Sequence, residues 1–358
     1  WLVERKMLSN DQIEFFNLNG YLVIEDVVDQ RTILDPIRDE YGLLLDRLIS
    51  DWVKKNKVSK KIINLNFQEK LLETYKLGLD WFQPFDISLP GDTIKVDTPM
   101  HFSSNMFNLL KCEKILDIVE QIIGPEITSN PIQHIRLKPP TAYLRKQESR
   151  AHVSKTDWHQ DRGVTLEDAD YTQMITVWVA VTDASLSNGC LKVIPKGSID
   201  KLLPHCPQRQ TAIAKDFISE SDAISLPVKS GGLIIIHPLT PHSSLDNVSN
   251  DFRWSFDIRY NKSGEPTKIG SLILNSVNPD HVKEAFGVMP PDLSLIARSR
   301  GPDWLYTFLT SFYVDESRPL GVNNALYTNV GMPHVLAWME GLKELSSEKG
   351  KYTYISQG

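Results

Sequence analysis

The sequence predicts a mainly β fold, a double-stranded β-helix (jelly roll, cupin-like) with α-helices packed outside it at both ends of the chain. Three observations support this class. From Ile132 onward, apolar residues alternate with polar ones or form short runs, which is typical of strands. Clusters of Gly, Pro, Asn and Ser separate these runs, as in two-sheet β folds. Before and after them, apolar residues recur at helical spacing.

The first 130 residues are expected to be largely helical. Ser9 precedes a short helical pattern as a capping residue, and Gly20 ends that helix before a strand over residues 21–24. Apolar residues spaced by three and four predict a longer helix over 34–52, and lysines follow at the negative end of its dipole. Another helix is predicted over 112–123. The stretch 58–105 shows no clear period.

The β core is expected over residues 131–262, and short helices and loops over 263–358. We expect one domain over 1–358, because no internal repeat or low-complexity linker divides the chain. The C-terminal helices are predicted around 304–312 and 335–345. The expected core strands are 133–137, 173–183, 190–194, 232–236 and 252–260.

Composition narrows the class of partner. The chain has 39 Lys and Arg against 45 Asp and Glu, a net charge of −6, which argues against a nucleic-acid or anionic membrane surface and favours a small molecule. No apolar run approaches the roughly 20 residues of a membrane span. Three scattered cysteines indicate a reducing compartment, the cytoplasm being expected. The absence of an initiator Met leaves open that residues precede Trp1, and the oligomeric state is not indicated.

One short motif carries most of the chemical information. In Trp158-His159-Gln160-Asp161, strand alternation would place His159 and Asp161 on the same side, so that both reach one metal ion, while Gln160 faces away. A surface turn is the simpler explanation of such a pair. Two histidines further along, His237 and His242, are candidates for a third ligand. We prefer His242, because His237 lies in an aliphatic strand that suits a packing role.

Arg253 follows His242 by eleven positions in a strand whose odd positions are polar and whose even positions are apolar. If the odd positions faced solvent, this alternation would describe an ordinary surface strand. In a barrel, the odd face lines a polar mouth near the metal, and the even face packs beneath outer helices. Arg253 and Arg259 would then be buried and require anions, which Asp257 and a bound dicarboxylate could supply. An arginine is suited to a bidentate carboxylate clamp.

With these residues in view, the chain resembles the phytanoyl-CoA dioxygenase family of iron(II)- and 2-oxoglutarate-dependent oxygenases. The resemblance covers about residues 131–262, with a looser likeness at 8–28. The chain departs from the family's Pro-Gly-Ser-His turn, because it has Pro195-Lys196-Gly197-Ser198-Ile199. The matching residues are Trp158-His159-Gln160-Asp161, Trp178 with Asp183, Asn188-Gly189-Cys190-Leu191, Ile194-Pro195, Gly231-Gly232, His242 with Ser244, and Arg253.

The resemblance implies a non-haem iron dioxygenase whose iron ligands are His159, Asp161 and His242. It further implies that Arg253 and Ser244 bind the distal carboxylate of 2-oxoglutarate and that Trp178 lies near it. Fe(II), 2-oxoglutarate and O2 would be required, with ascorbate as reductant in vitro. A small metabolite, as in secondary metabolism, would be hydroxylated, or desaturated or cyclised, with release of succinate and CO2. A carboxylate at Asp161 occupies the place that chloride needs in related halogenases.

Two other classes remain possible from the residues alone. A zinc or manganese hydrolase can use the same three ligands, and a jelly roll can hold a structural metal or a non-catalytic ligand. Arg253 and Ser244 at their offsets favour the oxygenase. The sequence does not indicate the prime substrate.

Overall fold

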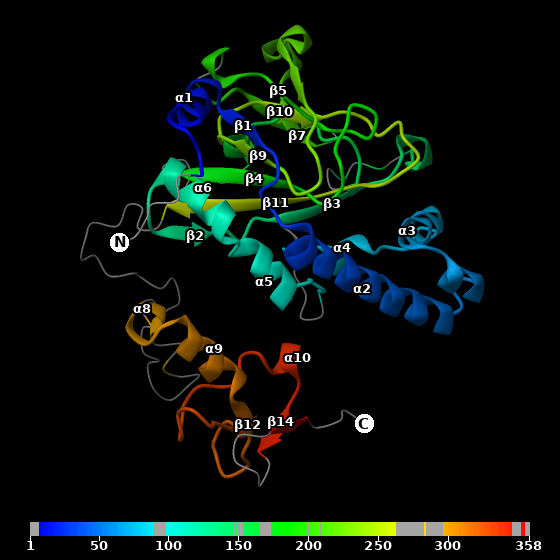
Figure 1. Cartoon of the computed structure of the whole chain (residues 1–358). Helices are drawn as coiled ribbons and strands as arrows, with labels where there is room; N and C mark the ends of the chain where they lie inside the picture. The colour runs from blue at the N-terminus through cyan, green and yellow to red at the C-terminus, as the bar shows by residue number, and fades with distance from the viewer. Residues whose placement is uncertain are drawn as a thin grey trace. The chain divides into compact units, whose positions relative to one another are not determined.

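The structure is a computed structural model of the chain (Figure 1). It describes residues 7–88, 98–146, 148, 150, 153–164, 173–198, 201–207, 210–262, 283, 296–345 and 352–354. The chain divides into two compact units, Trp1–Pro266 and Thr267–Gly358. The prediction of one functional domain over 1–358 stays a prediction, because compactness alone does not say whether the two units act together.

The predicted N-terminal helices are confirmed. Helix α1 (Asn10–Asn19) begins with a capping box in which Ser9 and Gln12 bond to each other's backbone N–H, and it ends at Gly20 in the left-handed conformation (φ 73°). Helices α2 (Asp35–Lys54) and α6 (Glu113–Ile123) match the other two predictions. A π-helical turn, Gln30–Leu34, leads into α2.

Three further helices lie in or directly after the stretch without a clear period. They are α3 (Phe67–Lys76), α4 (Phe82–Phe85) and α5 (Ser104–Leu110). Asn66 and Glu69 form a capping box, a local sequence signal for the start of α3. Helices of one to three turns contain too few residues for a 3.6-residue period to stand out.

The larger sheet holds six antiparallel strands in the order β1-β9-β4-β11-β2, and β3 also pairs with β11. Strands β1 and β2 precede residue 131, so the sheet extends beyond the range expected for the β core. The strands are β1 (Tyr21–Ile24), β2 (Ile127–Ser129), β3 (His134–Lys138), β4 (Met174–Ala180), β9 (Leu233–Ile236) and β11 (Arg253–Lys262).

A smaller antiparallel sheet, β10-β5-β8, faces the larger one. Its strands are β5 (Leu191–Val193), β8 (Ile224–Leu226) and β10 (His242–Ser244), and β6 (His205–Pro207) pairs with β7 (Thr211–Ile213) beside it. The five predicted core strands correspond to β3, β4, β5, β9 and β11, and β1 confirms the strand predicted over 21–24. The strands of these sheets that were not predicted, β2, β6, β7, β8 and β10, are three residues long. Two facing antiparallel sheets with flanking helices confirm the predicted jelly roll.

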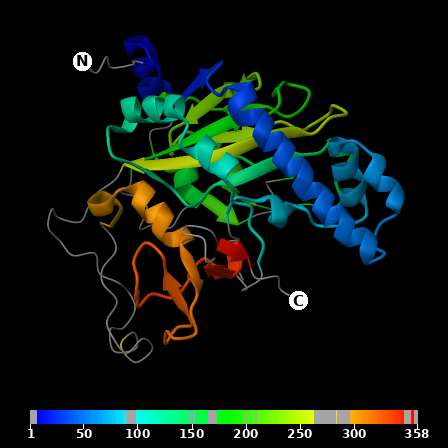
Figure 2. The same ribbon diagram turned by 60° about the horizontal axis from the view of Figure 1, so that its bottom comes forward.

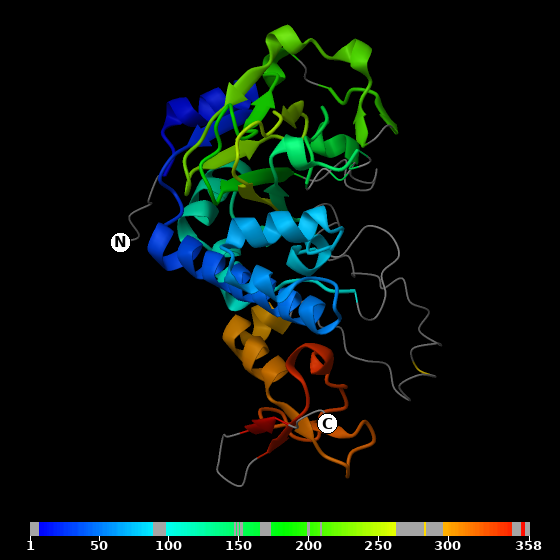
Figure 3. The same ribbon diagram turned by 90° about the vertical axis from the view of Figure 1, so that its right-hand side faces the viewer.

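Two hydrophobic clusters hold these layers together. One fills the space between the helices and the larger sheet, where Tyr41 of α2 packs against Trp254 and Phe256 of β11. The other lies between the two sheets and includes Trp178, Ile236 and Val193. Figures 2 and 3 show α2 as part of a separate layer on one side of the strands. Because the even residues of β11 belong to the first cluster, its odd residues face the interior between the sheets, as predicted.

The second unit is small. It contains α8 (Ile296–Arg300), α9 (Pro302–Thr310), α10 (Ala337–Glu340) and two hairpins, β12 (Phe312–Val314) with β13 (Val322–Asn324) and β14 (Lys343–Leu345) with β15 (Tyr352–Tyr354). Helix α9 confirms the prediction over 304–312. The prediction over 335–345 is wrong beyond one turn, because Gly341 ends α10 with φ 78° and a strand follows. No helix in the described residues could span a membrane.

Candidate functional site

His159 and His242 meet through a short antiparallel bridge between two segments far apart in the sequence. His159 N donates to His242 O at 3.0 Å, and His242 N donates to His159 O at 2.9 Å. The two imidazole rings lie with centroids 4.1 Å apart. His242 is the first residue of β10, whereas His159 belongs to no extended strand.

Asp161 joins them from the start of a 3-10 turn, Asp161–Val164. Its Oδ1 lies 3.9 Å from His159 Nε2 and 4.0 Å from His242 Nε2. All three side chains are buried, and their ligand atoms lie within 4.8 Å of one another. The expectation that His159 and Asp161 share a regular strand is wrong, because the chain turns after His159. They nevertheless converge, and Gln160 points away, with its amide bonded to the Lys201 and Leu239 carbonyls.

Both imidazoles are held with Nε2 free to bind a metal. His159 Nδ1 lies 2.9 Å from Asp157 O, and His242 Nδ1 lies 3.0 Å from Thr240 O. A carbonyl oxygen only accepts, so each Nδ1 carries the proton and each Nε2 keeps its lone pair. Burial, with the neighbouring His242, lowers the pKa of His159 to about 3, which keeps it neutral near pH 7. This donor set fits a divalent metal ion.

Arg259 and Thr176 fix the carboxylate of Asp161. Arg259 Nη2 donates to Asp161 Oδ1 at 2.8 Å, and Thr176 Oγ1 donates to Oδ2 at 2.5 Å. Burial acts to raise the pKa of Asp161, but Arg259, the two imidazoles and the Thr176 hydroxyl together hold it well below its usual range. Asp161 is therefore an anion in the folded protein. Residues that orient a ligating carboxylate in this way tune metal affinity.

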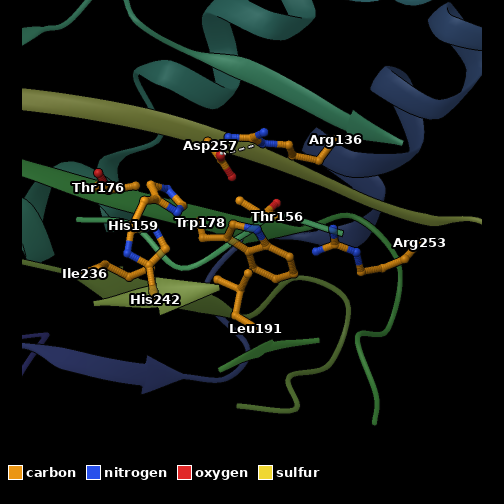
Figure 4. A pocket seen from close by; sticks show the side chains of 10 residues that line it. All are labelled: Arg136, Thr156, His159, Thr176, Trp178, Leu191, Ile236, His242, Arg253 and Asp257. Carbon is orange, nitrogen blue, oxygen red and sulfur yellow. Dashed lines mark hydrogen bonds and ion pairs between the residues drawn. The ribbon is translucent and has the colours of Figure 1, made fainter. Parts of the chain in front are cut away.

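Arg253 lies at the far end of the same pocket, with Trp178 between it and the histidines (Figure 4). It is fully buried, and its guanidinium carbon lies 5.1 Å from the centre of the Trp178 ring. Among the described residues, Nε and Nη1 have no hydrogen-bond partner. Burial and the nearby Arg136 lower the pKa of Arg253 to about 10, which leaves it charged at neutral pH.

Asp257 does not pair with Arg253 or Arg259 as the sequence suggested. It accepts from Arg136 Nε at 2.7 Å, and Arg136 Nη2 lies 2.6 Å from the same oxygen. Arg136 comes from β3, where its position opposite Ser255 of β11 puts it on the interior face. Arg259 instead bonds Asp161, so the anion expected for Arg253 has to come from outside the described residues.

Ser244, two residues after His242, is buried next to Thr156, which lines the pocket. Its Oγ accepts from Thr156 N at 2.9 Å and from Lys138 Nζ at 2.6 Å. Lys138 also donates to Thr156 Oγ1 at 2.9 Å. Lys138 and Arg136 were not identified as site residues, although the alternation of β3 from His134 to Lys138 places both on its polar face.

The structure brings together five of the predicted site residues around one small cavity and places Ser244 beside it. The lining includes His159, His242, Trp178 and Arg253, and Asp161 lies within 4.0 Å of both histidines. The cavity volume is about 20 Å³, room for an ion or a single water in this conformation.

His237 does not belong to the group of His159, Asp161 and His242, in agreement with the choice of His242 over His237 as the candidate third ligand. Its Nε2 lies 3.4 Å from Lys196 Nζ, and its Nδ1 accepts from Leu239 N. Burial and the adjacent Lys196 and Arg162 lower the pKa of His237 to about 4. It is a packed residue beside α1, where it contacts Phe16.

Comparison with known proteins identifies a protein family and several relatives of this chain. The sequence model of the family described as "Phytanoyl-CoA dioxygenase (PhyH)" matches residues 16–255. A probable phytanoyl-CoA dioxygenase of Caenorhabditis elegans is 24% identical over 267 residues, covering 72% of this chain and 76% of that protein. Cytochrome c1 of Allochromatium vinosum is 48% identical over 91 residues, which is 25% of this chain and 37% of that protein.

The solved structure of EctD from S. alaskensis, determined with 2-oxoglutarate and 5-hydroxyectoine, resembles this chain with a TM-score of 0.49. The two are 16% identical, and the likeness covers 75% of this chain and 80% of that one.

Proposed function

The chain belongs to the phytanoyl-CoA dioxygenase family, and we propose that it is an iron(II)- and 2-oxoglutarate-dependent dioxygenase that oxidises a small organic metabolite. The family consists of oxygenases of this type. The observation that carries the proposal is the convergence of His159, Asp161 and His242, buried and within 4.8 Å of one another, in a pocket that ends at an unpaired buried arginine.

We propose that these three side chains hold the ferrous ion through the two Nε2 atoms and the Asp161 carboxylate. Two imidazoles and a carboxylate on one face leave the opposite positions open, as non-haem iron oxygenases require. When bound, iron with 2-oxoglutarate and O2 supplies the oxidising power, and the cosubstrate leaves as succinate and CO2. Asp161 provides a protein ligand where a halogenase leaves room for chloride, which favours hydroxylation, with desaturation or cyclisation as related outcomes.

The residues of the chain have the task of binding and orienting the cosubstrate. Arg253 is suited to the distal carboxylate, because it lines the pocket and its buried Nε and Nη1 atoms have no hydrogen-bond partner among the described residues. The Ser244 hydroxyl lies next to that position, and Trp178 forms the wall between the two ends of the pocket. The hydrophobic cluster around Trp178 excludes water from the reacting centre.

The unpaired arginine also argues against the rival classes. A zinc or manganese hydrolase needs the three ligands and a water. That interpretation does not explain why a buried guanidinium lacks an anionic partner in the described part of the chain. A structural metal site would be closed by a fourth protein ligand, and among the described residues the group contains three.

We infer that the cytochrome c1 match falls on the second unit, since Thr267–Gly358 has about the length of that match and the dioxygenase family model ends at residue 255. The similarity to cytochrome c1 does not imply that this chain binds haem. Cysteines stand only at 112, 190 and 206, so the Cys-x-x-Cys-His attachment motif is absent from the sequence. We therefore propose that the oxygenase chemistry resides in the first unit.

We further propose that the protein works in a reducing compartment such as the cytoplasm, where its three free cysteines stay reduced. A small organic molecule is the proposed partner, and no nucleic acid is expected, given the net charge of −6.

The test combines metal binding with turnover. The purified protein should bind one equivalent of Fe(II) or Mn(II) and form succinate from 2-oxoglutarate in the presence of Fe(II), O2 and ascorbate. The Asp161→Ala variant should lose both properties, while Asp216→Ala, at an exposed 3-10 turn, serves as the matched control. Stoichiometric metal binding by the Asp161→Ala protein, or succinate formation without iron, would contradict the proposal.

A further inference from the structure

Lys138 is an unusual residue, because it is a buried lysine without a carboxylate. Only 2% of it is exposed, and no described carboxylate forms an ion pair with it. Its two hydrogen-bond acceptors are neutral hydroxyls, those of Thr156 and Ser244. Burial, with Arg253 and Arg136 nearby, lowers the pKa of Lys138 well below its usual value. A lysine in this position is costly for the protein unless an anion shares the site.

The surrounding charges favour the binding of such an anion. Lys138 stands directly opposite Arg253 in the β3–β11 pairing, and Arg136 stands opposite Ser255 on the same face. The one carboxylate among these side chains, Asp257, is bonded to Arg136. Lys138 and Arg253 therefore place two cationic side chains on neighbouring strands, and neither forms an ion pair with a described carboxylate. At the other end of the pocket, Arg259 already balances Asp161.

Lys138 also determines what the Ser244 hydroxyl can do. A serine hydroxyl has one proton to donate and two lone pairs that accept. Thr156 N and Lys138 Nζ occupy both lone pairs of Ser244 Oγ. The hydroxyl proton must therefore point elsewhere, and its geometry leaves Ser244 as a donor.

We propose that Lys138 is a second cationic anchor for the distal carboxylate of the 2-oxo dicarboxylate cosubstrate, acting with Arg253 and holding Ser244 as a hydrogen-bond donor to the same group. The inference rests on the proposed function and extends it. Three donors from three different strands, Lys138 of β3, Ser244 of β10 and Arg253 of β11, then surround one carboxylate. The pocket thereby selects a dicarboxylate over a 2-oxo acid that carries an alkyl end.

The test compares two ligands that differ only at that end. Binding of 2-oxoglutarate and of 2-oxopentanoate, which has a methyl group in place of the distal carboxylate, is measured by calorimetry on the Mn(II)-loaded full chain without O2. Lys138→Met should weaken 2-oxoglutarate by about 10- to 100-fold, the value of a lost charged hydrogen bond, and leave 2-oxopentanoate unchanged. Lys138→Gln can still donate a hydrogen bond to Ser244, so its affinity for 2-oxoglutarate should lie between those of the wild type and Lys138→Met.

The matched control is Lys70→Met, which removes a largely buried lysine of α3 that has its own partner in Asp46 at 2.7 Å. It should bind both ligands as the wild type does. If Lys138→Met binds 2-oxoglutarate with unchanged affinity, or loses both ligands equally, Lys138 has only a structural role and the inference is overturned. Should Lys138→Met fail to fold, the same two outcomes apply to Lys138→Gln. Wild-type protein that binds no 2-oxoglutarate would instead refute the proposed function.

Discussion

Replacing Arg253 by methionine should make the ligand-free protein more stable while it destroys cosubstrate binding. Methionine keeps the length of the aliphatic stem, so the packing against Trp178 is largely retained. The change removes a fully buried guanidinium whose Nε and Nη1 lack partners among the described residues. It also removes the attraction between Arg253 and Asp257 and the repulsion of Arg253 from Arg136 and Lys138, and these act in opposite directions, so burial of the guanidinium decides the sign.

The two effects have opposite signs and separate magnitudes. A buried polar group left unsatisfied costs about 1–3 kcal/mol, so the free energy of unfolding should rise by about that amount in the absence of ligand. Truncating one partner of a buried charged pair costs about 2–5 kcal/mol of binding free energy. That corresponds to a loss of roughly 30-fold to 4,000-fold in affinity for 2-oxoglutarate.

Urea unfolding of the metal-free protein measures the first effect, and calorimetric titration with 2-oxoglutarate measures the second. Arg38→Met is the matched control, because Arg38 bonds Asp35, Ser230 and the Val181 carbonyl. It should lower stability and leave 2-oxoglutarate binding unchanged. If Arg253→Met lowers stability as Arg38→Met does, or binds 2-oxoglutarate with wild-type affinity, Arg253 is a structural residue and the assignment fails.

Three further predictions concern the metal end of the pocket and the division of the chain. Arg259→Met should weaken Mn(II) binding by about 10- to 100-fold, because Asp161 loses the group that orients it; equal affinity in a metal titration would dismiss this role. In metal-free protein, His159 has a folded pKa of about 3, below its unfolded value near 6.5, so the unfolded state binds more protons and stability falls as pH drops below about 6.5. His159→Asn should reduce the slope of unfolding free energy against pH by at most about 1.4 kcal/mol per pH unit. Urea unfolding followed from pH 7 to pH 4 measures this slope. Identical slopes in the variant and the wild type would speak against a buried neutral imidazole. A chain ending at Pro266 should retain iron-dependent succinate formation, and complete loss of activity in a folded truncation would show that the two units act together.

Several elements could be predicted because their determinants are local. The Ser9 capping box and the Gly20 stop of α1 involve residues within a few positions of each other. The alternation of β11 fixed which face carries Arg253, Asp257 and Arg259, since a strand's two faces follow directly from the order of its residues. The choice of His242 over His237 rested likewise on neighbouring positions.

The errors and omissions concern contacts between distant segments. A regular strand was expected through His159 and Asp161, but the bridge to His242 and the turn after it place these residues instead. The pairing of Asp161 with Arg259, and of Asp257 with Arg136, depends on which strands become neighbours in the sheet.

The sequence by itself determined the class of fold, the polar face of each long strand and the identity of the side chains suited to binding a metal. Only the tertiary structure decided which charges neutralise one another and which remain unpaired, leaving Arg253 and Lys138 without carboxylates at one end of the pocket. The physical reason is that periodicity is a property of consecutive residues. Charge balance in a buried pocket depends on distances between strands that lie a hundred or more residues apart along the chain, as Lys138 and Ser244 do at a separation of 106 positions.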